Sequence, residues 1–290
     1  MPPPLVLPGL VLVLLGVVVG LVRPRVPARV ALWTVGGLAA LAAVVSVTTL
    51  AGLAASYLLD VNGLGAVVGY CVAVTGHRHV PWWLGTTALL GSVLVVIRMS
   101  RAARRRRRAG TGHEGRRLEV LDTSTPMAFA APGSPGCVVV SRGMLEALDP
   151  EERRVLIAHE RAHLDARHHR FLLAADLAVA AMPLLVPLAR QVRLATERSA
   201  DEMAVAAVGG DRDLVARAIG HAALAGDRVE AGGFLGGSVV ERVAALSRAP
   251  VGTGVGVLAG AGGLAIWATA ALLGMVQVVR LASLVAHLCR

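Results

Sequence analysis

The stretch His159-Glu160-Arg161-Ala162-His163 is followed, 34 residues after its second histidine, by Glu197-Arg198-Ser199-Ala200-Asp201. Two histidines four apart on a helix lie one turn above each other, so each can offer a ring nitrogen to the same metal ion. A carboxylate from a second helix would complete a set of three protein ligands. The pattern therefore predicts a zinc ion (Zn²⁺) bound by His159, His163 and Glu197.

The predicted chemistry is hydrolysis of a peptide bond. Zinc with three protein ligands keeps one position for water and lowers the pKa of that water to about 7. Glu160 follows the first histidine and is the predicted general base. A chance pair of surface histidines is the alternative, but strong helix signals precede the motif: Asp149 is a favourable N-cap, Pro150 suits the first helical position, and Glu151 and Glu152 suit the positive helix end.

A second carboxylate accompanies the third ligand. Asp201 lies one helical turn after Glu197, so both side chains face the same way. A ligating histidine commonly donates its free ring N–H to a carboxylate, and we expect Asp201 to accept from one of the pair. Alternatively, both acids could form surface ion pairs with Arg193 or Arg198.

A rival third ligand is His169, six residues after His163. This is the spacing of the third histidine in the H-E-x-x-H-x-x-G-x-x-H pattern. The glycine of that pattern turns the chain back towards the metal, and Ala166 occupies its position here. We therefore expect the helix to continue and to carry His169 away from the metal. His168 and His221 are interpreted as surface residues or as residues that support the ligands.

The composition is that of a membrane protein. The chain is 55% hydrophobic with a mean hydropathy of +0.66, and its apolar residues form long blocks. Blocks long enough to cross a bilayer occupy residues 5–22, 30–59, 81–97 and 251–279. The first differs from a cleaved signal peptide because no positive residue precedes it and no small-residue cleavage site follows it.

Arginines set the predicted orientation. They cluster after the first block at Arg23, Arg25 and Arg29, and after the third at Arg98 and 101–108. By the positive-inside rule both loops are cytoplasmic, so the chain is predicted to be a multi-pass protein of the plasma or inner membrane with an external N-terminus. The arginine run contains no aromatic residue and adjoins a predicted span, so we expect contact with anionic lipid of the bilayer and no direct binding of nucleic acid.

The predicted fold class is mostly α, with about four transmembrane helices and a cytoplasmic α+β peptidase domain. The expected divisions are a membrane domain at 1–108, the peptidase domain at 109–250, and a last helix with a short tail at 251–290. Residues 64–75 are too few to span and predict an interfacial or re-entrant loop. Residues 109–126 are interpreted as a linker because they are charged and rich in glycine.

Two further segments bear on the site. Residues 136–141 predict a strand before the zinc helix, either an edge that lines the cleft or part of the core. Residues 171–189 are apolar but contain Asp176 and two prolines. A crossing there would put Glu197 and the two histidines on opposite sides, so we expect this segment to be buried against the domain or to lie partly in the membrane surface.

In this order of features the chain resembles the BlaR/MecR-type membrane metallopeptidases, bacterial antibiotic-sensing signal transducers, and their shorter relatives. The shared features are three spans, the segments 126–129 and 138–141, the histidine motif, the Glu197/Asp201 pair and a fourth span. The resemblance implies a gluzincin-like domain, zinc on the three ligands named above, Glu160 as general base, and cleavage of the chain itself or of a cytoplasmic transcriptional repressor.

The resemblance has one departure and leaves alternatives. The antibiotic sensors carry an extracellular penicillin-binding domain after the fourth span, and this chain stops soon after that span, so sensing by that route is not expected. HtpX-type quality-control peptidases share the zinc motifs, usually with a longer spacing to the glutamate. A non-catalytic signalling scaffold with a vestigial zinc site is the third possibility, although Glu160 argues against it.

The last block contains Gly256 and Gly260, a spacing that lets helices approach closely in lipid. We expect this helix to pack on the N-terminal spans or on a membrane partner, which includes a second copy of the chain.

Overall fold

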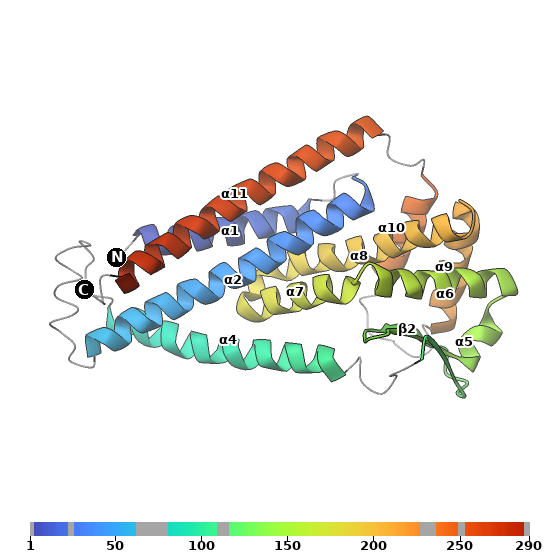
Figure 1. Cartoon of the computed structure of the whole chain (residues 1–290), viewed down its shortest axis with the longest axis horizontal. Helices are drawn as coiled ribbons and strands as arrows, with labels where there is room; N and C mark the ends of the chain where they lie inside the picture. The colour runs from blue at the N-terminus through green and yellow to red at the C-terminus, as the bar shows by residue number, and fades with distance from the viewer. Residues whose placement is uncertain are drawn as a thin grey trace.

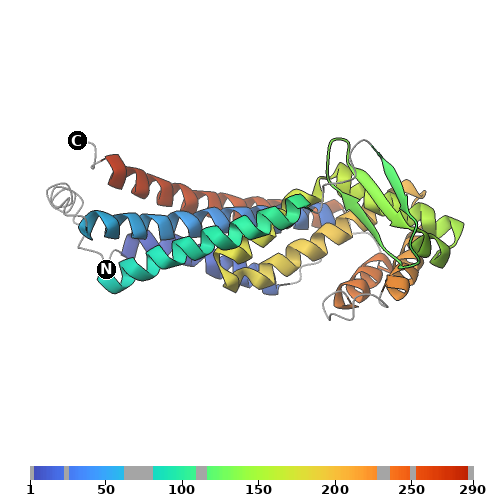
Figure 2. The same cartoon turned by 90° about the horizontal axis from the view of Figure 1, so that it is seen from below.

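The computed structural model describes residues 3–22, 26–61, 81–108, 116–226, 236–248 and 253–286. The molecule is elongated, with long helices at one end and a small sheet with shorter helices at the other (Figures 1 and 2). The long helices are α1 (Pro3–Leu21), α2 (Ala28–Val61), α4 (Trp82–Arg108) and α11 (Thr253–Ala286). The remaining helices are α5 (Arg142–Ala147), α6 (Pro150–Asp165), α7 (His168–Ala181), the 3-10 helix η1 (Pro183–Leu185), α8 (Val186–Ala207), α9 (Arg212–Gly226) and α10 (Gly236–Leu246).

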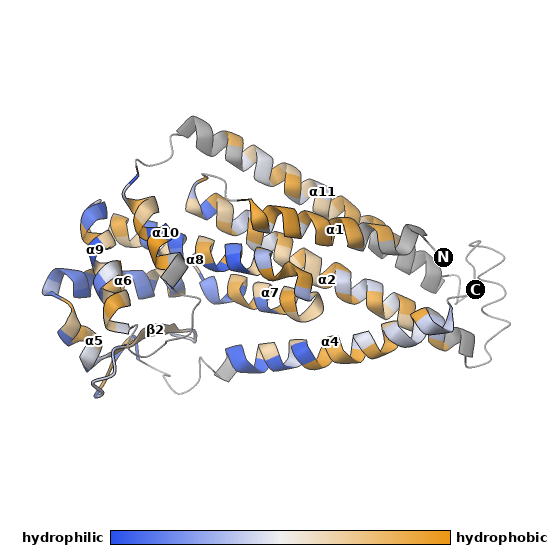
Figure 3. Ribbon diagram, turned by 180° about the vertical axis from the view of Figure 1, so that it is seen from behind, coloured by the Kyte–Doolittle hydropathy of each residue, from blue (hydrophilic) through white to orange (hydrophobic). Residues whose placement is uncertain are grey.

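Apolar residues dominate the long helices, whereas polar residues are frequent at the other end (Figure 3). Among the described residues, two helices are long and apolar enough to cross a membrane, at Ala28–Ala55 in α2 and Trp82–Arg106 in α4. The apolar stretches of α1 and α11, Gly9–Leu21 and Gly260–Val276, are shorter. Two candidate helices suggest membrane association, and four crossings stay a prediction. The loop predicted at residues 64–75 lies outside the described residues.

Helices α7 and α8 form a hairpin that packs among α1, α2 and α4 (Figures 1 and 2). α7 ends just before Met182 because Pro183 disfavours helical backbone in the residue that precedes it. Leu185, Leu188 and Val192 are fully buried in a core shared with α1 and α2. The apolar segment at 171–189 thus turns back at Pro183 and packs on the long helices. The expected burial against the peptidase domain is therefore wrong, and its place relative to a membrane stays a prediction.

Two glycines show how closely the long helices pack. A side chain at Gly20 of α1 would meet the backbone nitrogen of Leu188 at 2.4 Å, so α1 touches the backbone of α8. A side chain at Gly263 of α11 would similarly meet the hydroxyl oxygen of Thr34 in α2 at 2.6 Å. Nothing lies within 4 Å of the corresponding point at Gly260. α11 therefore packs on α1 and α2, as expected, but the described contacts do not use Gly260.

The sheet has the strand order β1-β3-β2, with β1 (Leu118–Leu121) parallel and β2 (Ala128–Ala131) antiparallel to β3 (Cys137–Ser141). The strand predicted at 136–141 is confirmed as β3. It is buried throughout and central, so it is core and not a cleft edge. The linker prediction is wrong for residues 118–121, because this short run gains its hydrogen bonds from β3, about 20 residues further along the chain.

Candidate metal centre

Helix α6 carries both histidines of the motif. The Asp149 carboxylate caps it by accepting from the backbone N–H groups of Glu151 (2.9 Å) and Glu152 (2.8 Å). The Glu152 carboxylate accepts from the N–H of Asp149 in return (3.2 Å), which completes a capping box. The predicted start of this helix is therefore confirmed. Its regular geometry presents His159 and His163 on one face towards α8, which packs beside it.

Three side chains converge between α6 and α8. Nε2 of His159 lies 3.1 Å from Nε2 of His163. The Glu197 carboxylate places Oε2 3.6 Å from Nε2 of His159 and Oε1 3.7 Å from Nε2 of His163. The described residues thus contain a group of two histidines and one glutamate that could hold a metal ion.

The donor spacing fits zinc. In a tetrahedral site with donors about 2.05 Å from the ion, neighbouring donors lie roughly 3.3 Å apart. The two Nε2 atoms lie 3.1 Å apart, close to that value. Each oxygen of the Glu197 carboxylate faces a different histidine, at 3.6 and 3.7 Å, and one donor atom from each of the three residues lies within 4.8 Å of the other two. Imidazole nitrogens and a carboxylate oxygen are also donors that zinc accepts. The residues present therefore fit a zinc ion with one position left for a non-protein ligand.

Each histidine has a different partner for its second ring nitrogen. Nδ1 of His159 lies 3.1 Å from Oδ1 of Asp201, which is buried one turn after Glu197. Nδ1 of His163 lies 3.1 Å from Nδ1 of His168, whose side chain is fully buried. Such partners fix the ring orientation and the tautomer of a ligating histidine. Asp201 lies beside His159 as expected, but Nδ1 of His159 meets no acceptor with hydrogen-bond geometry, so the role of Asp201 as acceptor stays a prediction.

The path of the chain after α6 differs from the expectation. α6 ends at Asp165, and Arg167 adopts a left-handed conformation (φ 51°), so the helix is interrupted, without any glycine, before α7 begins at His168. The expected continuation of the helix past Ala166 is wrong. This turn brings His168 onto His163, so of the two interpretations His168 supports a ligand and does not lie on the surface. His169 lies outside the group of converging donors.

His221 is also paired. It lies on α9, and its Nδ1 is 2.6 Å from Oε1 of Glu152, the buried glutamate of the capping box. This contact joins α9 to the first turn of α6, away from the converging donors.

Arg242 of α10 is a site residue that the sequence interpretation missed. Its guanidinium donates to Asp201 through Nε (2.9 Å) and Nη2 (2.7 Å), and Nη1 lies 3.0 Å from Oε2 of Glu197. The alternative, in which the two acids form surface ion pairs, is not seen, since Arg193 pairs with Asp176 and Arg198 donates to a backbone carbonyl. No motif surrounds Arg242, and 41 residues separate it from Asp201. Only the fold brings them together.

Glu160 lies on α6 beside this group and close to β2. Its carboxylate lies near the backbone of Ala130 in that strand. Burial raises the pKa of Glu160 above its usual value, against the opposing effect of a charged His159. A carboxylate with a raised pKa next to an open metal position is suited to accept a proton from water.

The charges of the metal-free site are unevenly distributed. Burial alone would lower the pKa of His159, but Asp201 and Glu197 together raise it to about 10. Burial and the charge on His159 lower the pKa of His163 to about 3. Despite burial, His159 and Arg242 hold the pKa of the Glu197 carboxyl below its usual range. Without metal, the cluster therefore keeps one proton on His159 and a charged Glu197.

A His-His-Glu donor group with a further glutamate beside it is the arrangement of a metallopeptidase centre. Residues 96–208 match the model of Peptidase family M48, and this match indicates a metal-dependent peptidase. The matched segment contains α6 and α8 with all the converging donors, but it ends before Arg242. No solved structure matched the chain. The match supports a zinc metallopeptidase family, and the narrower BlaR/MecR-type assignment stays a prediction.

Proposed function

We propose that this chain is an integral membrane zinc endopeptidase whose peptidase domain faces the cytoplasm. The main support is that one donor atom each from His159, His163 and Glu197 lies within 4.8 Å of the other two, inside the segment matched to a metallopeptidase family. A purely structural zinc site usually has four protein ligands. Here three donors converge, and Glu160 stands beside them.

His159, His163 and Glu197 would hold the zinc, which when bound supplies Lewis-acid polarisation of a carbonyl and of a water molecule. Asp201 and His168 keep the two imidazoles in the required orientation, and Arg242 holds both carboxylates of α8. Glu160 takes the proton of the attacking water and delivers it to the leaving amine as the C–N bond breaks.

We place the substrate backbone along β2. This strand lies at the edge of the sheet and packs against α6, and Ala130 within it touches Glu160. An extended peptide that pairs with a sheet edge presents its backbone at a fixed distance from that edge. The proposed substrate is therefore an extended segment of a protein.

We infer regulatory proteolysis of the chain itself or of a cytoplasmic protein such as a transcriptional repressor. The order of spans and motifs, which resembles the BlaR/MecR-type peptidases, supports this reading. A quality-control peptidase of the HtpX type would instead cut unfolded membrane proteins at many sites. The number of cleavage sites separates the two: one or two defined cuts support regulation, and many cuts in unfolded proteins support quality control.

Glu160→Gln tests the catalytic proposal. We expect the purified full-length variant to keep its zinc but to lose about 10²–10⁴-fold in hydrolysis of labelled casein and in self-cleavage, because the base is lost. Glu151→Gln, at an exposed glutamate of the same helix, is the matched control and should retain full activity. Activity of the Glu160 variant within tenfold of the wild type would refute its role as base.

A reporter that is active only outside the cytoplasm tests the orientation. A fusion near residue 112 should show no reporter activity, and a fusion after Arg290 should show activity, because the arginine-rich loops are expected to stay in the cytoplasm. The reverse pattern would exclude a cytoplasmic substrate.

A further inference from the structure

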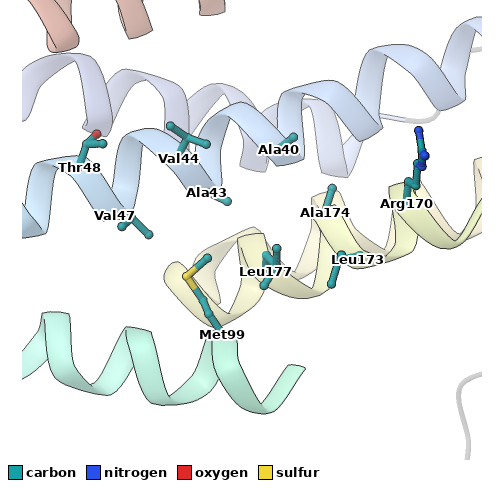
Figure 4. Close-up of a pocket in the computed structure, with 10 residues that line it drawn as sticks. All are labelled: Ala40, Ala43, Val44, Val47, Thr48, Met99, Arg170, Leu173, Ala174 and Leu177. Atoms are coloured by element: carbon teal, nitrogen blue, oxygen red, sulfur yellow. The ribbon is translucent and has the colours of Figure 1, made fainter. Parts of the chain in front are cut away.

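A groove of about 370 Å³ lies between α2, α4 and α7, and none of its lining residues belongs to the candidate metal ligands (Figure 4). Its lining comes from both helices that are long and apolar enough to cross a membrane. The lining residues are Ala40, Ala43, Val44, Val47, Thr48, Met99, Arg170, Leu173, Ala174 and Leu177. The groove would therefore lie at the depth of the bilayer if these two helices cross it.

The groove is apolar except at one end. Small side chains at Ala40, Ala43 and Ala174 create the space where α2 faces α7 (Figure 4). The hydroxyl of Thr48 donates to the carbonyl of Val45 in its own helix (3.1 Å), so it needs no other partner. The floor of the groove thus offers no polar partner to a ligand and selects an apolar chain.

Arg170 marks the polar end. It lies in the first turn of α7, on the side of the metal centre, while Leu177 lies about 10 Å further along the helix. Arg106 and Arg193 both pair with Asp176, whereas Arg170 forms no ion pair with any described residue. A guanidinium at the mouth of an apolar groove, at the domain end of the membrane helices, is complementary to a phosphate at the surface of a bilayer.

The volume of the groove agrees with a small ligand. Ligand sites of about 300–1,000 Å³ are usual, and the groove measures about 370 Å³. Its apolar lining with a single arginine at one end matches an acyl chain joined to a charged headgroup.

We propose that this groove binds an anionic phospholipid, with its phosphate on Arg170 and one acyl chain between α2 and α7. The proposal rests on insertion in a membrane but not on the peptidase activity. Because Arg170 and His168 share the first turn of α7, the bound lipid would lie next to the support of His163.

Native mass spectrometry of the full-length protein tests the proposal. Delipidated protein receives equal amounts of phosphatidylglycerol and phosphatidylcholine with identical acyl chains, and the retained lipid is counted. We expect a retained lipid on the wild type, with phosphatidylglycerol favoured about fivefold by one arginine contact. Arg170→Gln should abolish this preference, whereas Arg104→Gln, at an exposed arginine of α4 outside the groove lining, should preserve it.

A second experiment fills the groove with larger side chains and measures the retained lipid in the same way. Ala40→Leu with Ala174→Leu should remove the retained lipid, while Ala265→Leu with Ala268→Leu, at two exposed alanines of α11, should not. Flotation with vesicles and the thermal midpoint show that each variant is folded and inserted. Equal retention by the filled and control variants, or equal retention of both lipids by the wild type, would overturn the proposal. A peptide retained in the groove in place of lipid would overturn it as well.

Discussion

Replacing Arg242 with methionine should weaken zinc binding and destabilise the fold, because Arg242 contacts both carboxylates of α8. The change keeps an unbranched apolar stem but removes the guanidinium, and with it the contacts of 2.7 and 2.9 Å to Asp201 and of 3.0 Å to Glu197. The side chains of Arg242 and Asp201 are only 11% and 2% exposed, so water cannot replace the lost partner. Breaking one side of a buried ion pair costs about 3–5 kcal/mol.

The coupling between the two residues can be separated from other effects of each substitution. We expect a double-mutant cycle of Arg242→Met with Asp201→Asn to give a coupling above about 1.5 kcal/mol, the lower value for a hydrogen bond to a charged group. Arg212 and Glu202 form a similar bidentate pair, but the side chain of Glu202 is 46% exposed. The matched cycle at this pair should give less than about 1 kcal/mol.

The thiol of Cys137 provides a suitable assay because it is buried in β3 and reports on the sheet end of the molecule. Its labelling in increasing urea, followed by mass spectrometry, yields the free energy of unfolding of that region. Zinc content gives a second readout, and loss of a residue that orients ligands should weaken zinc binding about 10–100-fold. If the two cycles give equal couplings and zinc binding is unchanged, our reasoning about Arg242 is wrong.

Further predictions concern the ligands. Glu197→Ala should lose most bound zinc and His169→Ala should keep it, as measured by metal analysis of purified protein, because only Glu197 is among the converging donors; loss in the His169 variant alone would favour the rival ligand set. Since the pKa of His159 is about 10 without metal, this residue is protonated at pH 7.5, and coordination requires the neutral ring. Zinc binding should therefore release about one proton, seen by calorimetry in two buffers of different ionisation enthalpy; the same heat in both buffers would contradict this assignment.

Part of the site could be read from the sequence because it depends on local geometry. The spacing of four residues puts His159 and His163 on one helical face wherever the helix is placed, and Asp149 and Pro150 mark where that helix begins. The sequence also required residues 171–189 to turn back, because the three donors must share one side of a membrane. The strand at 137–141 followed from its β-branched residues.

Other features were decided by tertiary contacts. The left-handed backbone of Arg167 costs of order 1 kcal/mol or more, and packing of α7 against α2 and α4 must offset that cost before His168 can reach His163. β1 is too short to form without β3, and its sequence contains no pattern that predicted a strand. Arg242 reaches Asp201 only because α10 packs on α8 and α9.

The sequence by itself therefore determined which side chains can share a helical face, and so it determined the candidate donors and the base. Which residues surround those donors was decided by the tertiary structure, since such contacts join segments far apart in the chain. Their energies depend on burial, which no local pattern encodes. The groove beside Arg170 also depends on tertiary structure, because its alanines leave a space only where α2 packs beside α7.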